Sequence, residues 1–111
     1  MGLTAIKITI MSGADDGKVF ELEKNHIMLG RHTDDDVFLP YDSRVSRHHA
    51  RITKKGDSYF IEDVGPEEKG STNGTYVEDK KIGTKTAISS GEMILLGNVW
   101  VKFESGTAKA G

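Results

Sequence analysis

Three short segments of the chain carry side chains that could together bind an anion. The densest is Ser43-Arg44-Val45-Ser46-Arg47-His48-His49-Ala50; the others are Gly30-Arg31 and Ser71-Thr72-Asn73-Gly74-Thr75. An arginine offers parallel N–H donors to two oxygens of a phosphate, and hydroxyl and amide groups can pair with the remaining oxygens. The same residue types also occupy ordinary loops, because they favour turns. Residue types alone therefore leave two interpretations open: a site for a tetrahedral dianion, or solvated loops.

These segments lie between short apolar runs that predict β-strands. Ile6, Ile8 and Ile10 alternate with polar residues, which is the period of two expected of a half-buried strand. Ten such runs are expected, at 4–11, 19–22, 26–29, 37–39, 50–54, 59–61, 75–77, 80–82, 93–96 and 99–103. No amphipathic helix is expected, and strands spaced by roughly 8–12 residues favour a sandwich or a barrel. Loops at one end of such a fold converge, so the three segments can meet.

Composition limits the possible functions. The chain has 111 residues, enough for one domain, and 15 basic against 17 acidic residues give a formal charge of -2. This charge opposes sequence-independent binding to nucleic acid, so any anion site must be local. The chain has no cysteine, no apolar run of about 18 residues and no secretory signal. We expect a cytoplasmic protein without a membrane association, or a nuclear one in a eukaryote.

The order and spacing of the three segments resemble those of the forkhead-associated (FHA) domain. Between the first two segments, Asp36-Val37-Phe38-Leu39 is similar to the acidic-apolar-any-leucine segment of that family, and Gly91-Glu92-Met93-Ile94 and Leu96-Gly97 match its later part. Three separated motifs in the right order are far more specific than any one of them. The resemblance indicates an FHA domain at residues 1–104, followed by a flexible tail or linker at 105–111.

The resemblance implies an all-β fold, an antiparallel β-sandwich of about eleven strands with the binding loops at one end. It also implies phosphothreonine-dependent binding in Ser/Thr kinase signalling. The partner would be a phosphothreonine-containing protein or peptide, either a separate molecule or a segment of the same full-length chain. We expect a monomer that needs no cofactor or metal and does not bind nucleic acid.

The family pattern implies roles for the matching positions. Four residues would form the phosphate site or lie beside it: Arg31, Ser46, Arg47 and Thr72. Asn73 would bind the peptide backbone, and Arg44 would face the residue three positions after the phosphothreonine and favour an acidic one. Three residues would hold the loops in place: Gly30, His49 and Gly74. A phosphate monoester carries about -1.5 to -2 charge near pH 7 and gains charge-assisted hydrogen bonds that a threonine hydroxyl cannot make.

Two segments depart from the family pattern. Pro66-Glu67-Glu68-Lys69-Gly70 makes one loop longer than usual, and its two glutamates are expected to discourage acidic peptides on that side. Glu78-Asp79-Lys80 stands where the family commonly has an Asn-Gly turn. The resemblance therefore predicts a less regular hairpin at this point, away from the site.

Other functions are favoured less. A hydrolase would use Ser46 as nucleophile with His48 or His49 as base, but no Gly-x-Ser-x-Gly motif or identifiable acidic partner is present, so no enzyme is expected. The run 34–36 and the four histidines lack the spacing of a calcium or zinc site, and a solvated acidic loop is expected there, with Asp36 bracing the next strand. A basic stripe at 44–55 lacks the aromatic residues of a nucleic-acid site.

One alternative remains open within the same fold. A domain of this kind could serve protein assembly without using phosphate, since a fold does not determine a function. The presence of Arg31, Ser46 and Asn73 together favours phosphate binding.

Overall fold

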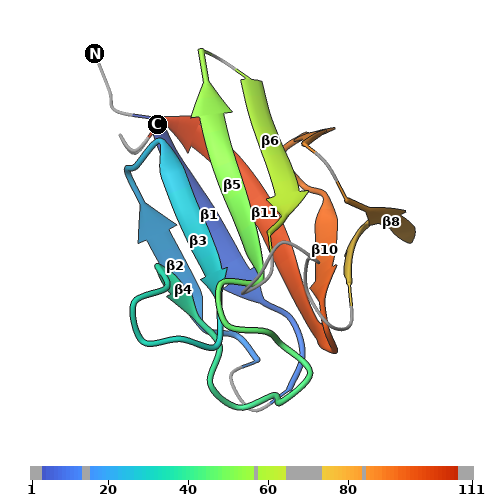
Figure 1. The fold of residues 1–111 in the computed structure, drawn as a ribbon. Helices are drawn as coiled ribbons and strands as arrows, with labels where there is room; N and C mark the ends of the chain where they lie inside the picture. Colours follow the sequence, from blue (N-terminus) through green and yellow to red (C-terminus); the bar gives the residue numbers. More distant parts are fainter. Residues whose placement is uncertain (1–3, 14–15, 57, 65–73, 84, 108–111) are drawn as a thin grey trace.

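The computed structural model describes residues 4–13, 16–56, 58–64, 74–83 and 85–107, and it shows a β-sandwich of two facing sheets (Figure 1). The described residues contain no helix, and hence none that is long and apolar enough to cross a membrane. Eleven strands are present: β1 (Thr4–Ile10), β2 (Val19–Leu22), β3 (His26–Gly30), β4 (Val37–Phe38), β5 (Ala50–Lys55), β6 (Ser58–Asp63), β7 (Thr75–Val77), β8 (Lys80–Ile82), β9 (Thr86–Ile88), β10 (Met93–Leu96) and β11 (Val99–Thr107). The predicted all-β sandwich is confirmed.

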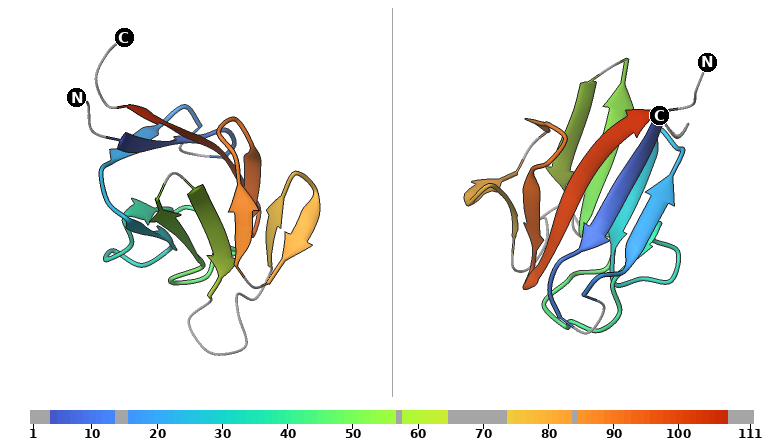
Figure 2. Two further views of the ribbon diagram at one scale, coloured as in Figure 1. Left: turned by 90° about the horizontal axis from the view of Figure 1, so that it is seen from above. Right: turned by 180° about the vertical axis from the view of Figure 1, so that it is seen from behind.

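The strands form a six-stranded sheet, in the order β2-β1-β11-β10-β7-β8, and a five-stranded sheet, in the order β4-β3-β5-β6-β9. The β3 and β4 strands pair in parallel, and the other strand pairs among the described residues are antiparallel. Figure 2 shows the two sheets as separate layers, with β2, β1 and β11 side by side in the view from behind. Four hairpins (β1–β2, β5–β6, β7–β8 and β10–β11) are joined by pairs of strands that are not consecutive in sequence, such as β1 with β11 and β6 with β9.

The core lies between the two sheets and is built from the alternating apolar residues. Ile6, Ile8 and Ile10 of β1 are each no more than 1% exposed. Burying an aliphatic side chain of this size stabilises the fold by roughly 1.5–3 kcal/mol. Across the core, the rings of Tyr59 in β6 and Phe103 in β11 meet edge to face with their centroids 5.4 Å apart. The period of two read from the sequence therefore identifies the buried face correctly.

The two ends of the sandwich differ. At one end, Thr4 of β1 pairs with Thr107 of β11. At the opposite end lie the loops that follow β3, β4 and β10, together with the end of β6 and the start of β7 (Figure 1). Segments that carry the predicted site residues are therefore gathered at one end.

Two strands differ from the prediction. The short β9 strand (Thr86–Ile88) was not predicted; it pairs with β6, and only Ile88 of its three side chains is buried. The β11 strand was expected to end at Phe103, but it continues to Thr107 by pairing with β1. Residues 105–107, assigned to the tail by the sequence, are thus part of a sheet. The domain boundaries as a whole remain a prediction.

The β7–β8 hairpin is more regular than the sequence predicted. Val77 pairs with Lys80, and Glu78 and Asp79 form the two-residue turn between them with φ of 47° and 72°. Positive φ at both turn residues matches the twist of antiparallel strands, which is why Asn-Gly is common there. The hairpin keeps its register, and the cost of having Glu78 and Asp79 is local backbone strain.

Candidate functional site

Arg31 lies directly after β3, and its position is fixed by two hydrogen bonds to the loop that precedes β5. Its backbone N–H donates to the Ser46 carbonyl at 3.1 Å, and its side-chain Nε–H donates to the Val45 carbonyl at 2.9 Å. Among the described residues, the two Nη atoms have no hydrogen-bond partner. The guanidinium is therefore oriented by Nε and keeps two donor nitrogens for a ligand.

Ser46 and His49 form a compact turn within the same loop. Ser46 is 7% exposed and His49 is fully buried. The Ser46 N–H donates to Nδ1 of His49 at 3.0 Å, and Nε2 of His49 lies 2.8 Å from the Gly74 carbonyl. Because a carbonyl can only accept, the proton of the imidazole lies on Nε2. His49 thereby links the Ser46 loop to the start of β7.

The buried state of His49 affects its protonation. Burial away from water holds the pKa of the imidazole below its ordinary value of 6.5, and this effect outweighs the Gly74 carbonyl and the Asp63 carboxylate, which favour the charged form. A neutral imidazole can accept from Ser46 at one nitrogen and donate to Gly74 at the other. Charge on His49 is therefore not part of any anion site here.

Asp35 is the buried acidic residue of the site. Its side chain is fully buried, and Oδ2 accepts from the backbone N–H groups of His32 at 3.0 Å and His48 at 3.1 Å. Its Oδ1 lies 2.5 Å from Nδ1 of His48, a residue with a positive φ of 49°. The carboxylate thus ties the loop after β3 to the loop before β5. The prediction of a solvated acidic loop at 34–36 is wrong for this residue.

Asp36 braces β3, as well as the start of β4. Its Oδ2 accepts from the Met28 N–H at 2.9 Å, and its Oδ1 contacts Nζ of Lys24. Partial burial raises the pKa of this carboxyl, but the hydrogen bonds from Lys24 and Met28 and the charge of Lys24 outweigh it, so the pKa lies below its usual value. Asp36 therefore stays ionised and supports the strand that leads to Arg31.

Two glycines allow the loops to approach closely. A Cβ on Gly30 would lie 2.4 Å from Oδ2 of Asp35 and 2.6 Å from the backbone nitrogen of His48. A Cβ on Gly97, in the turn between β10 and β11, would lie 2.4 Å from the Arg44 carbonyl oxygen. Any side chain at either position would separate segments that now touch.

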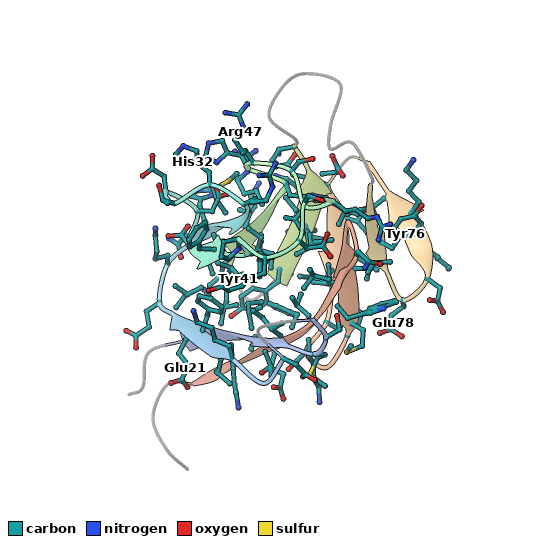
Figure 3. All side chains as sticks on the ribbon, turned by 90° about the horizontal axis from the view of Figure 1, so that it is seen from below. Glu21, His32, Tyr41, Arg47, Tyr76 and Glu78 are labelled. Carbon is teal, nitrogen blue, oxygen red and sulfur yellow. The ribbon has the colours of Figure 1, made fainter. Side chains whose placement is uncertain are left out.

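Arg44 and Arg47 are exposed on the same loop. The Arg44 N–H donates to the Asp42 carboxylate at 2.8 Å, which shapes the loop before Ser46. Figure 3, which views the loop end, shows Arg47 beside His32. The rings of His32 and His48 lie 4.9 Å apart. The structure therefore places Arg31, Arg44, Ser46 and Arg47 around two adjoining loops at one end of the sandwich.

Of the remaining predicted site residues, the structure describes only Gly74. Thr72 and Asn73, and the longer loop at 66–70, lie outside the described residues. Gly74 is described: it has a φ of 85°, and its carbonyl accepts from both His49 and the Gly97 N–H. Gly74 thus lies where the His49 side chain and the β10–β11 turn meet.

Asp35 and Gly97 were missed as site residues by the sequence interpretation. The only signal for Asp35 was its position in an acidic run, which does not tell which carboxylate turns inward. Gly97 matches a family motif in the sequence, but its approach to Arg44 depends on tertiary structure. Among the described residues, no group of three or more metal-ligating side chains is placed to hold an ion.

A two-sheet sandwich that presents arginines, a serine and buried loop-bracing residues at one end is the architecture of a loop-based binding module. A family model for the FHA domain matches residues 27–97. The chain belongs to the FHA domain family, as its motifs predicted.

Similar proteins agree with this assignment. The chain is 35% identical over 103 residues to an oxoglutarate dehydrogenase inhibitor of Corynebacterium jeikeium, covering 93% of this chain and 67% of that protein. A structure from a study of phosphothreonine-dependent FHA domain interactions superposes with a TM-score of 0.76 and 26% identity, over 90% of this chain and 95% of that chain. The structure of Mycobacterium tuberculosis EmbR in complex with a low affinity phosphopeptide superposes with a TM-score of 0.78 and 25% identity. This match covers 96% of this chain and 26% of that chain.

The curated relatives are longer than this chain, which spans 57% to 67% of their lengths. The shared part is the domain described above. FHA domains are binding modules that read phosphorylated motifs through clustered arginines.

Proposed function

We propose that the loop end of this domain binds a phosphothreonine-containing segment, supplied by another protein or by a further part of the same full-length chain. A phosphate with a charge of about -2 accepts charge-assisted hydrogen bonds that a neutral threonine hydroxyl cannot form. The binding equilibrium is therefore switched by phosphorylation of the partner. The proposal is supported by similar structures from a study of phosphothreonine-dependent FHA domain interactions and of EmbR in complex with a phosphopeptide.

In this proposal, Arg31 and Ser46 contact the phosphate. Thr72 adds a donor, Asn73 holds the peptide backbone, and Arg47 lies beside the phosphate. Arg44 favours an acidic residue three positions after the phosphothreonine. Gly30, His49 and Gly74 hold the loops in the required arrangement.

The observation that carries the proposal is the state of the Arg31 side chain. Its Nε–H is engaged by the Val45 carbonyl, while both Nη atoms are without a partner among the described residues. A guanidinium held in place before the ligand arrives loses less conformational entropy on binding than a mobile one. The hydrogen bond to Val45 thus orients the Arg31 guanidinium before binding, so that its two Nη atoms can donate to two oxygens of a phosphate.

Fluorescence anisotropy against a degenerate phosphothreonine peptide library tests this function and reports flanking preferences together. Arg31→Ala is expected to abolish measurable affinity while the domain stays folded, with a loss of stability of about 1 kcal/mol or less from the single hydrogen bond. Arg51→Ala is the matched control, because Arg51 pairs with Glu62 on the face of the five-stranded sheet. The affinity of the Arg51→Ala variant for phosphothreonine peptides should be unchanged.

The alternative is an assembly domain that does not use phosphate. It predicts equal affinity for phosphorylated and unphosphorylated versions of a partner segment, and no effect of Arg31→Ala. Either result would contradict the phosphothreonine proposal while leaving the fold and family intact.

A further inference from the structure

The outer face of the six-stranded sheet carries an open hollow of ≈ 430 Å³. Its walls are Met11, Met93, Trp100, Glu78 and Asp79. They come from the residue directly after β1, from β10 and β11, and from the β7–β8 turn. In Figure 3, Glu78 lies on the other side of the molecule from His32 and Arg47. The hollow therefore shares no residue with the proposed phosphate site.

Strand pairing brings the three apolar side chains of the hollow together. The Met11 N–H donates to the Trp100 carbonyl at 2.8 Å, so these residues lie opposite each other near the start of β11. Ile94 and Val101 are fully buried on the inner face. Because side chains alternate along a strand, their neighbours Met93 and Trp100 point to the outer face. A tryptophan and two thioethers thus form the floor of the hollow.

The two carboxylates of the hollow lie at its rim. Oε2 of Glu78 accepts from the Met93 N–H at 2.7 Å, and the Glu78 N–H donates to the Met93 carbonyl at 3.1 Å. Asp79 follows in the same tight turn, with a φ of 72°. Neither residue forms an ion pair with another described residue. The rim therefore carries two negative charges, of which the Glu78 carboxylate is held by a hydrogen bond, and no basic residue lines the hollow.

We propose that this hollow binds an arginine side chain of a partner protein. Met11 and Met93 would contact the apolar stem, since thioethers adapt to irregular shapes. The guanidinium would stack on the Trp100 indole, and the Glu78 and Asp79 carboxylates would accept its hydrogen bonds. Arginine suits this combination better than lysine, because its planar and weakly hydrated head group can stack and donate at the same time.

Lys102 provides an internal test of the charge argument. It pairs with Met93 across the β10–β11 ladder, next to the hollow, but it does not line it. Its positive charge opposes an incoming guanidinium. Removal of this charge should strengthen arginine binding, whereas removal of the rim carboxylates should weaken it.

The probe is a short capped peptide with a central arginine, and the matched control is the same peptide with citrulline, which keeps the shape without the charge. Trp100 is the only tryptophan of the chain, so its fluorescence reports the hollow directly. The methyl signals of Met11 and Met93 should shift in methionine-methyl NMR spectra. That of Met28, on the other sheet, should not. Saturable binding in the millimolar range is expected for one side chain.

Variants that preserve shape complete the test. Glu78→Gln keeps an oxygen that can accept from Met93, and Asp79→Asn tolerates a positive φ. The double variant should lose at least about fivefold in arginine affinity, and Lys102→Gln should gain about twofold. Arg31→Ala should leave the arginine response unchanged. Failure of the phosphothreonine proposal and failure of this one are therefore distinguishable.

Several results would overturn the proposal. These are the absence of a saturable response in the folded protein, an equal response to the citrulline peptide, and an unchanged response in the double carboxylate variant. Sedimentation equilibrium is the final check. A dimer whose formation shifts the Met11 and Met93 signals in the absence of peptide would show that a second copy of the chain covers the hollow instead.

Discussion

At the scale of single residues, His49 makes the stability of the domain depend on pH. Burial holds the pKa of its imidazole below 6.5 in the folded protein. The unfolded chain keeps the ordinary value, so below about pH 6.5 it binds a proton that the folded protein does not. Proton uptake then favours unfolding. The stabilisation is complete above that pH and is lost as the pH falls, at up to about 1.4 kcal/mol per pH unit.

Urea unfolding measured at about pH 7.5 and about pH 5.5 checks this expectation. The His49→Gln variant should be less stable overall, since an amide cannot reproduce both hydrogen bonds, but its stability should change less between the two pH values. An equal change in both proteins would assign the effect to other histidines. His26, His32 and His48 are all less buried than His49.

Asp35 has no contact with the ligand in this proposal, yet its substitution should damage the site strongly. Asp35→Ala leaves the part-buried N–H groups of His32 and His48 without their acceptor. The expected loss of stability is roughly 2–4 kcal/mol, with a weaker affinity for phosphothreonine peptides because the two loops separate. Asp35→Asn keeps an acceptor oxygen for these groups and should be much milder. Urea unfolding and anisotropy on both variants test this; equal damage from both would contradict the hydrogen-bond explanation.

At the scale of elements, the turn between β10 and β11 supports the loop that holds Arg31. A Cβ on Gly97 would lie 2.4 Å from the backbone oxygen of Arg44, and its φ is 62°. Gly97→Ala should therefore cost roughly 2–4 kcal/mol of stability and reduce phosphothreonine-peptide affinity, because Val45, whose carbonyl orients Arg31, is the next residue. Thermal unfolding and anisotropy measure the two effects.

Gly83→Ala is the matched control for this prediction. A Cβ at Gly83 would meet no atom within 4 Å, and its φ is not in the left-handed region. Its stability should change by no more than about 0.5 kcal/mol, with affinity unchanged. If Gly97→Ala behaved like Gly83→Ala, the turn would not be a support of the site.

The strands show which parts of the fold a sequence can reveal. Runs such as Ile6, Ile8 and Ile10 are readable because each buries an apolar side chain at every second position. The β9 strand has one buried side chain in three, so periodicity cannot identify it. The end of β11 is held by backbone pairing with β1, which depends on the partner strand rather than on its own small side chains.

The same distinction applies to the site. Arg31, Ser46 and His49 were found because their types and spacing are specific. Asp35 could not be found, since its burial follows from the meeting of two loops that are 13 residues apart in sequence. The sequence did not predict the hollow lined by Met11, Met93 and Trp100 for the same reason, because its walls come from four separate segments of the chain.

At the scale of the whole molecule, three regions are separate in space. The pairing of Thr4 with Thr107 marks one end of the sandwich, and the loops that follow β3 and β4 lie at the other (Figure 1). The hollow at Trp100 lies on the outer face of the six-stranded sheet. The phosphate site and the hollow share no residue. Two weak contacts on one partner would reinforce each other, because the second then forms at a high effective concentration.

Ligand binding at the loop end should stabilise the entire domain, because only the folded protein has the site. At a peptide concentration of 100 times the dissociation constant, the gain is about 2.7 kcal/mol, which raises the melting temperature of a domain this size by roughly 10 °C. Differential scanning fluorimetry measures this with a phosphothreonine peptide. The unphosphorylated peptide, and the phosphopeptide with the Arg31→Ala variant, should give no shift.

Since the formal net charge is -2, duplex DNA at the same phosphate concentration should give no shift of the melting temperature either. A shift with DNA as large as that with the peptide would mean that the loops recognise negative charge in general rather than one phosphorylated residue.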